Sequence, residues 1–160
     1  MLGLTLAREK VPDGHHLMRY VPFGQQIRDP DDCSFRGIVG TAFSVRPSDK
    51  GGLSLTWVEH YGEKSEATYS IAASHFRDSL EKKKLATQAY FAIGQAGLTR
   101  KTAAAHGKQV RIVHAPDGPN SGHVELLRFT DEDRVLLDAL AIDVFSEHVA
   151  VVKLTLLPPI

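Results

Sequence analysis

The segment 53–59 alternates apolar and polar side chains, and it constrains the fold more than any other part of the sequence. Three apolar side chains fall on one side of the extended chain: Leu53, Leu55 and Trp57. Ser54 and Thr56 fall on the other side. Because successive side chains of a strand point to opposite faces, this pattern predicts a β-strand with one face in a core and the other in solvent.

Other short segments also have the character of strands, and they are separated by turn residues or by helical stretches. These predicted strands are 16–23, 38–46, 89–94, 110–114, 123–129 and 150–157. Segments 38–46 and 53–59 are expected to pair as a hairpin, and the polar stretch 24–36 is expected to be a loop.

Helices are predicted over 63–87, over 99–106 with Gly107 closing it, and from Thr130 as N-cap to about His148. Strands cluster early and helices are interspersed later. This order favours an α+β fold over a repeating βαβ fold. We therefore predict one α+β domain over 1–160, with an antiparallel or mixed sheet of about six short strands and two main helices.

Composition supports a folded domain and excludes a disulfide-stapled one. The chain has 160 residues, of which 42% are hydrophobic and 24% are charged, which is typical of globular proteins. Its one cysteine, Cys33, has no partner within the chain and follows two aspartates, which favour the thiol over the reactive thiolate. We therefore expect a resting free thiol.

The sequence predicts a cytoplasmic protein. No stretch approaches the ~20 apolar residues that a membrane-spanning helix requires. The first residues, Met1 to Arg8, lack the basic start and the longer apolar run of a signal peptide.

The net charge is zero, but its distribution along the chain is uneven. The segment 75–111 holds eight basic and two acidic residues, whereas 112–160 holds three basic and eight acidic ones. A basic segment attracts phosphate groups, and an acidic segment docks on basic surfaces. This pattern favours contact with a nucleic acid or nucleotide through 75–111. It also favours binding to a protein partner or self-association. The alternative is two solvated surfaces that serve solubility.

The standard motifs of catalysis and cofactor binding are absent from the sequence. It has no phosphate-binding glycine loop, no dinucleotide-binding glycine motif, no nucleophile elbow, no paired-cysteine zinc site and no His-Glu-x-x-His motif. We expect no cofactor and no resident metal.

The loop 115–122 has a histidine at each end, His114 and His123. If the flanking strands pair antiparallel, the loop brings the two imidazoles near each other. Two such groups can act as base and acid on a phosphodiester, because imidazole titrates near neutral pH. This pattern predicts a metal-independent phosphodiesterase or ribonuclease.

The same loop permits other interpretations. With Asp117 as a third ligand, the histidines could bind a metal. Loop residues Asn120 and Ser121 lie among glycines whose backbone N–H groups can bind an anion. The histidines could also be ordinary polar surface residues.

A run of three lysines, Lys82, Lys83 and Lys84, lies within the predicted long helix, a few residues before Tyr90 and Phe91. A basic face with aromatic side chains is typical of surfaces that hold single-stranded nucleic acid. The alternative is that the aromatic residues belong to the core and the lysines are solvated.

In the N-terminal half, Arg19 lies within a predicted strand, and Ser54 and Thr56 lie on another. This set faintly resembles the arginine–serine–glutamate arrangement of ADP-ribosyltransferases. The resemblance implies that Arg19 and Ser54 hold a nicotinamide dinucleotide and that Glu59 or Glu125 polarises its ribose. The serine motif is incomplete, and alternating hydroxyls are usual on a solvent-facing strand.

The stretches Ala42-Phe43-Ser44-Val45-Arg46-Pro47 and Arg111-Ile112-Val113-His114 are similar to those of small bacterial and phage proteins with no assigned activity. The resemblance spans most of the chain and adds nothing on mechanism. The sequence alone favours a binding or accessory domain that contacts a phosphate-bearing ligand or a partner protein through 114–123 and the basic segment.

Overall fold

The computed structural model describes residues 10–45, 52–130 and 132–160 as an α+β fold built on a six-stranded sheet. The strands are β1 (His16–Val21), β4 (Leu53–Trp57), β5 (Tyr90–Gln95), β6 (Arg111–His114), β7 (His123–Leu127) and β8 (Glu147–Ala150). They lie in the order β6-β7-β4-β1-β5-β8, and each neighbouring pair is antiparallel. The predicted fold class is confirmed.

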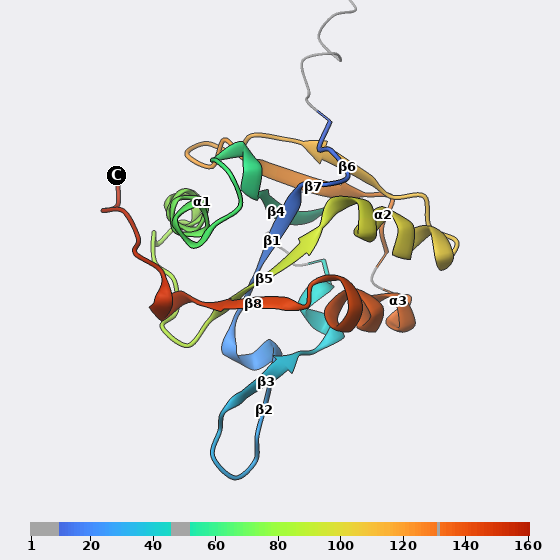
Figure 1. Cartoon of the computed structure of the whole chain (residues 1–160), viewed down its shortest axis with the longest axis horizontal. Coiled ribbons are helices and arrows are strands. Elements are labelled where there is room, and N and C mark those ends of the chain that lie inside the picture. The colour runs from blue at the N-terminus through green and yellow to red at the C-terminus, as the bar shows by residue number, and fades with distance from the viewer. Residues whose placement is uncertain (1–9, 46–51, 131) are drawn as a thin grey trace, which may run out of the picture.

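Helices cover both faces of this sheet (Figure 1). Helix α1 (Glu66–Ser79) packs on one face, which we call the α1 face. Helices α2 (Ala96–Ala105) and α3 (Arg134–Ala139) pack on the other, the α2/α3 face. Alternation along β1 divides the core accordingly, because Leu17 belongs to the cluster on the α2/α3 face and Met18 to the cluster on the α1 face.

The segment predicted as a loop, 24–36, is largely a hairpin that projects from the body of the molecule (Figure 1). Its strands are β2 (Gln26–Arg28) and β3 (Phe35–Ile38). At the tip, the Asp29 carboxylate accepts hydrogen bonds from the backbone of Asp31 and from Arg36. These bonds stabilise a polar turn. Because the turn residues dominate the segment, the sequence pattern predicts a loop and misses the short strands on either side.

Beyond Ile38, which ends β3, the predicted strand 38–46 is wrong over its described part. Residues Gly40–Phe43 form a 3-10 helix, and β4 pairs with β1 and β7 instead of with this segment. A Cβ atom at Gly40 would lie 3.0 Å from the backbone nitrogen of Asp138, so the segment passes directly against α3. Ala42 and Phe43 are therefore buried in a 3-10 helix and not in a strand. Residues 46–51, which lie between the two segments of the predicted hairpin, are outside the described part.

Helix α1 is shorter than the predicted helix 63–87. The Ser65 side chain caps it by accepting from the backbone N–H of Thr68, and the helix ends at Ser79 because Leu80 is extended. The three lysines therefore follow the helix, and Lys83 adopts a positive φ of 48°. Helix α2 begins before the predicted range 99–106, and Gly107 closes it with a φ of 76°, as predicted.

The C-terminal elements differ from the prediction in their boundaries. Asp133, and not Thr130, caps α3 by accepting from the backbone of Leu136. The helix continues as a π-helix over Leu140–Val144. The predicted strand 150–157 is wrong beyond Ala150, because β8 ends there and a 3-10 helix follows over Val151–Lys153. After β8 the chain runs along α1, where the backbone N–H groups of Thr155 and Leu157 donate to Ser70 and Ser74.

Candidate functional site

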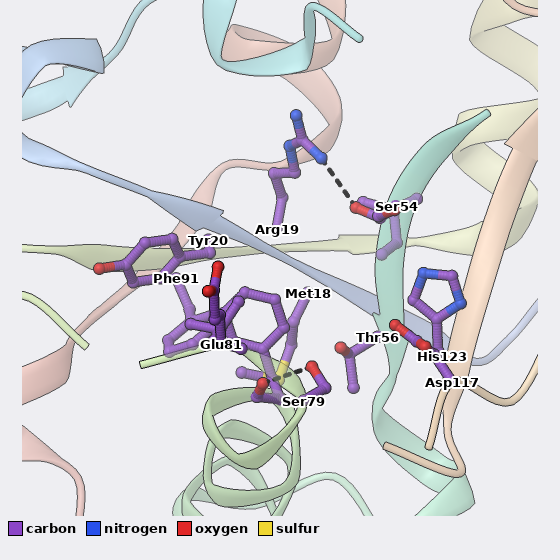
Figure 2. Close-up of a pocket in the computed structure, with 13 residues that line it drawn as sticks. Met18, Arg19, Tyr20, Ser54, Thr56, Ser79, Glu81, Phe91, Asp117 and His123 are labelled. Carbon is purple, nitrogen blue, oxygen red and sulfur yellow. Dashed lines mark hydrogen bonds between the residues drawn. The ribbon is translucent and has the colours of Figure 1, made fainter. Parts of the chain in front are cut away.

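A cavity of about 390 Å³ lies between the C-terminal end of α1 and the α1 face of the sheet (Figure 2). Strands β1, β4, β5 and β7 form its floor, the end of α1 forms one wall, and the loop before β7 forms the other. The lining residues are Met18, Arg19, Tyr20, Ser54, Leu55, Thr56, Phe76, Ser79, Leu80, Glu81, Phe91, Asp117 and His123.

One half of the cavity is apolar and largely aromatic. The rings of Tyr20, Phe76 and Phe91 contact one another with centroids 5.4 to 5.8 Å apart, and Met18 lies beside them. The backbone N–H of Ala86 donates to the Tyr20 hydroxyl at 2.9 Å, which fixes the segment after α1 against this ring. Such a wall suits the flat, apolar part of an organic molecule.

The other half of the cavity is polar. Ser54 and Thr56 of β4 face it, together with His123 of β7 and Asp117 of the preceding loop. The Nδ1 atom of His123 lies 2.7 Å from the carbonyl oxygen of Ala115. A carbonyl only accepts, so Nδ1 is the donor in this contact, and in the neutral form of the ring Nε2 is then the hydrogen-bond acceptor.

A buried asparagine fixes the loop that carries Asp117. Asn120 is fully buried and donates to Thr56 Oγ1 at 3.1 Å. Its Oδ1 accepts from the Tyr61 hydroxyl at 2.6 Å, and that hydroxyl accepts from the backbone N–H of Gly122. Burial raises the pKa of Tyr61, so the phenol keeps the proton that it donates. The polar wall is therefore held in place by the body of the protein.

The expectation that His114 and His123 lie near each other is wrong, although the strands on either side of their loop do pair antiparallel. His114 lies opposite Val124, which belongs to the core of the α2/α3 face. His123 directly precedes Val124 in β7, so its side chain points to the opposite, α1 face and lines the cavity. The His114 ring instead packs against Trp57 and His60, with centroids 5.5 and 5.2 Å away.

The structure does not assemble the metal site that the sequence permits on this loop. In the described part of the chain, no group of three or more His, Cys, Asp or Glu side chains is placed to hold a metal ion, so the predicted set with Asp117 as third ligand is not formed. The backbone N–H groups of Asp117, Asn120 and His123 donate to carbonyls of the loop, and that of Ala115 donates to the carbonyl of His123. Anion binding by the remaining N–H groups of the loop stays a prediction. Ser121 is exposed, and its hydroxyl contacts His60 Nε2 at 3.0 Å.

Arg19 and Ser54 are neighbours, but not in the arrangement that the resemblance to ADP-ribosyltransferases implies. The Arg19 side chain, 2% exposed, extends into the α2/α3 face, and Figure 2 shows it pointing away from the cavity. It donates to the backbone carbonyl of Ser54, whereas the Ser54 side chain faces the cavity. Glu125 lies opposite Ser54 on the α1 face, and Glu59 is held by His16.

A second polar cluster lies near the other end of α1 and holds elements together. Glu147 accepts from the Tyr69 hydroxyl at 2.7 Å and pairs with Lys64 at 2.8 Å. Burial acts to raise the pKa of Glu147, but the two bonds outweigh it and leave that pKa lowered. Burial, with the bond to Glu147, raises the pKa of Tyr69 to about 12. The cluster ties α1 to β8.

The basic segment does not combine with aromatic residues into one surface. Phe91 is 1% exposed and lines the cavity, whereas Tyr90 points to the opposite face and stacks on Phe35 at 3.8 Å. Lys82, Lys83 and Lys84 are exposed, and Lys83 donates to the backbone oxygen of Ile160. Nucleic-acid contact through 75–111 stays a prediction that rests on charge alone.

The apolar wall was not identified from the sequence as part of a site. Met18, Tyr20 and Phe91 have the character of core residues, and only the fold shows that α1 leaves space above them. The sequence evidence for the polar side of the cavity was the pair Ser54 and Thr56. Their alternation with apolar residues is equally typical of a strand that faces solvent, so it does not indicate a cavity.

Comparisons with known proteins add no information on the site. No protein family, curated protein or solved structure matches this chain. In the described part of the chain, no helix combines the length and apolar character that a membrane span needs.

Proposed function

We propose that this protein is a binding domain for a small organic ligand, held in the cavity between α1 and the sheet. The observation that carries the proposal is the cavity itself, at about 390 Å³ with an aromatic wall facing a polar one. Ligand sites are typically concave, mostly apolar and a few hundred Å³ in volume, with a small number of polar groups that fix orientation.

The polar groups support this proposal because they are preorganised. His123 has its Nδ1 atom bonded to the Ala115 carbonyl, and Thr56 is held by Asn120. Side chains that are already fixed lose little conformational freedom when a ligand binds.

A neutral fluorescent probe tests the proposal directly. N-phenyl-1-naphthylamine emits strongly only in apolar surroundings, and we expect it to bind with a stoichiometry of one per chain. Ser54→Phe places a ring where the Ser54 side chain faces the cavity and is expected to abolish the fluorescence increase. Ser146→Phe is the matched control, since Ser146 is exposed and does not line the cavity.

Two results would contradict the proposal. One is probe binding that is unchanged in a folded Ser54→Phe variant, with circular dichroism verifying the fold. The other is equal loss of binding in both variants, which would indicate adsorption to exposed apolar surface. The phosphate-bearing ligand expected from the sequence remains an alternative: binding of inorganic phosphate that declines as salt rises would favour it.

A further inference from the structure

The two charged side chains that face the cavity, Asp117 and Glu81, are both negative. Asp117 lies at the β7 side beside His123, and Glu81 reaches over the cavity from the end of α1 (Figure 2). In the neutral form of the His123 ring, Nε2 offers a further acceptor, because Nδ1 is the donor to Ala115. These three groups offer acceptors from two sides of the cavity.

In the segments that the structure describes, the positively charged side chains nearby do not pair with the carboxylates of Asp117 and Glu81. Among the described lining residues, Arg19 alone carries a permanent positive charge, and its guanidinium donates to the carbonyls of Ala42, Ser44 and Ser54 on the other face of the sheet. The lysines that follow Glu81 do not line the cavity, and the Lys83 ammonium is held by Ile160.

The aromatic wall adds a second preference for positive charge. Tyr20, Phe76 and Phe91 contact one another and line the cavity. The faces of such rings attract cations, most strongly where water is excluded. An organic cation therefore gains from both walls, whereas an anion meets two carboxylates.

We propose that the ligand is an organic cation, a protonated amine attached to an aromatic or apolar body. This inference rests on the proposed function and names the class of molecule that the same cavity takes. The amine lies toward Asp117 and His123, and the apolar body lies against Tyr20, Phe76 and Phe91.

Three indole compounds of nearly equal shape test the charge preference. Tryptamine carries a positive charge, tryptophol carries none and indole-3-propionate carries a negative one, each at the end of the same two-carbon chain. With binding followed by isothermal titration calorimetry at low salt, we expect tryptamine to bind at least about tenfold more tightly than indole-3-propionate. We expect tryptophol to lie between them, and the tryptamine preference to shrink as salt is raised.

Variants then locate the preference. Asp117→Asn keeps the shape of the side chain and removes its charge, so it is expected to reduce tryptamine binding severalfold and to leave tryptophol binding nearly unchanged. Glu81→Gln provides a second, independent measurement at an exposed position. Asp143→Asn is the matched control, because Asp143 is exposed on the π-helix that follows α3.

The outcomes separate this inference from the proposed function. Equal binding of tryptamine and tryptophol, tighter binding of indole-3-propionate, or a preference that both Asp117→Asn and Glu81→Gln leave intact would overturn the cation assignment. Binding of N-phenyl-1-naphthylamine without any binding of tryptamine would overturn it too, while the cavity kept its role. Failure of the naphthylamine and of all three indoles would overturn the proposed function itself.

Discussion

Replacing Arg19 with methionine removes a buried guanidinium that joins three segments of the chain. Its Nε donates to the carbonyl of Ala42 at 2.9 Å, Nη1 to that of Ser54 at 2.9 Å and Nη2 to that of Ser44 at 3.0 Å. These bonds attach β4 and the chain around the 3-10 helix Gly40–Phe43 to β1. Methionine keeps the apolar stem and leaves three carbonyls without this donor.

The expected loss of stability follows from these bonds. A hydrogen bond to a charged group contributes about 1.5–3 kcal/mol, and an acceptor that stays buried without its donor costs a similar amount. Because the three carbonyls relax together and the contributions do not add fully, we expect Arg19→Met to lower the free energy of unfolding by about 3–5 kcal/mol. That is a large part of the ~5–15 kcal/mol typical of a domain. Urea denaturation followed by the fluorescence of Trp57, the single tryptophan, measures it.

Arg36→Met is the matched control. The Arg36 side chain is 60% exposed and pairs with Asp29 at the tip of the β2–β3 hairpin. Exposed ion pairs contribute little, so this variant is expected to stay within about 1 kcal/mol of the wild type. A loss below about 1 kcal/mol for Arg19→Met would refute the structural role assigned to Arg19.

Three further substitutions test the core packing, a half-buried histidine and the anchoring of the loop 115–122. Gly94→Ala places a Cβ atom 2.8 Å from the buried ring of Phe145, so we expect its melting to show a loss of about 1–3 kcal/mol, and Gly24→Ala, with open space, to show none. Burial lowers the pKa of His148, so the wild type loses stability as pH falls through the unfolded-state value of about 6.5, and His148→Phe is expected to lose less between pH 7 and pH 5 in urea titrations. Asn120→Ala removes two side-chain hydrogen bonds, and hydrogen exchange of residues 115–122 is expected to accelerate while the sheet stays protected. Unchanged exchange there would contradict the role of Asn120 as the anchor of the loop.

The sequence predicted strands best where the pattern of side chains is local. The alternation in 53–57 and the β-branched and aromatic run before Gly94 both correspond to strands of the sheet. Residues 40–43 are different, because Gly40 packs closely against Asp138 of α3, about 100 positions away in the sequence. A local sequence pattern does not distinguish residues that are buried in a sheet from residues that are buried against a distant helix.

The histidines of the candidate site illustrate the limit set by strand register. The loop 115–122 reverses the chain as expected, but His114 lies opposite Val124 and not opposite His123. A shift of one residue moves every side chain of a strand to the other face of the sheet. Sequence spacing therefore predicted the hairpin and could not predict whether its two imidazoles share a face.

The unequal covering of the two faces explains why the site lies where it does. On the α2/α3 face, β4 contributes Leu53, Leu55 and Trp57 to a core that two helices close. On the α1 face the same strand contributes Ser54 and Thr56, although Thr56 is only 3% exposed. Polar side chains on a covered face provide less stability than apolar ones of similar size, so their presence there favours a role in binding. On the proposal that this cavity binds a ligand, filling it with a larger apolar side chain is expected to raise stability and to abolish binding.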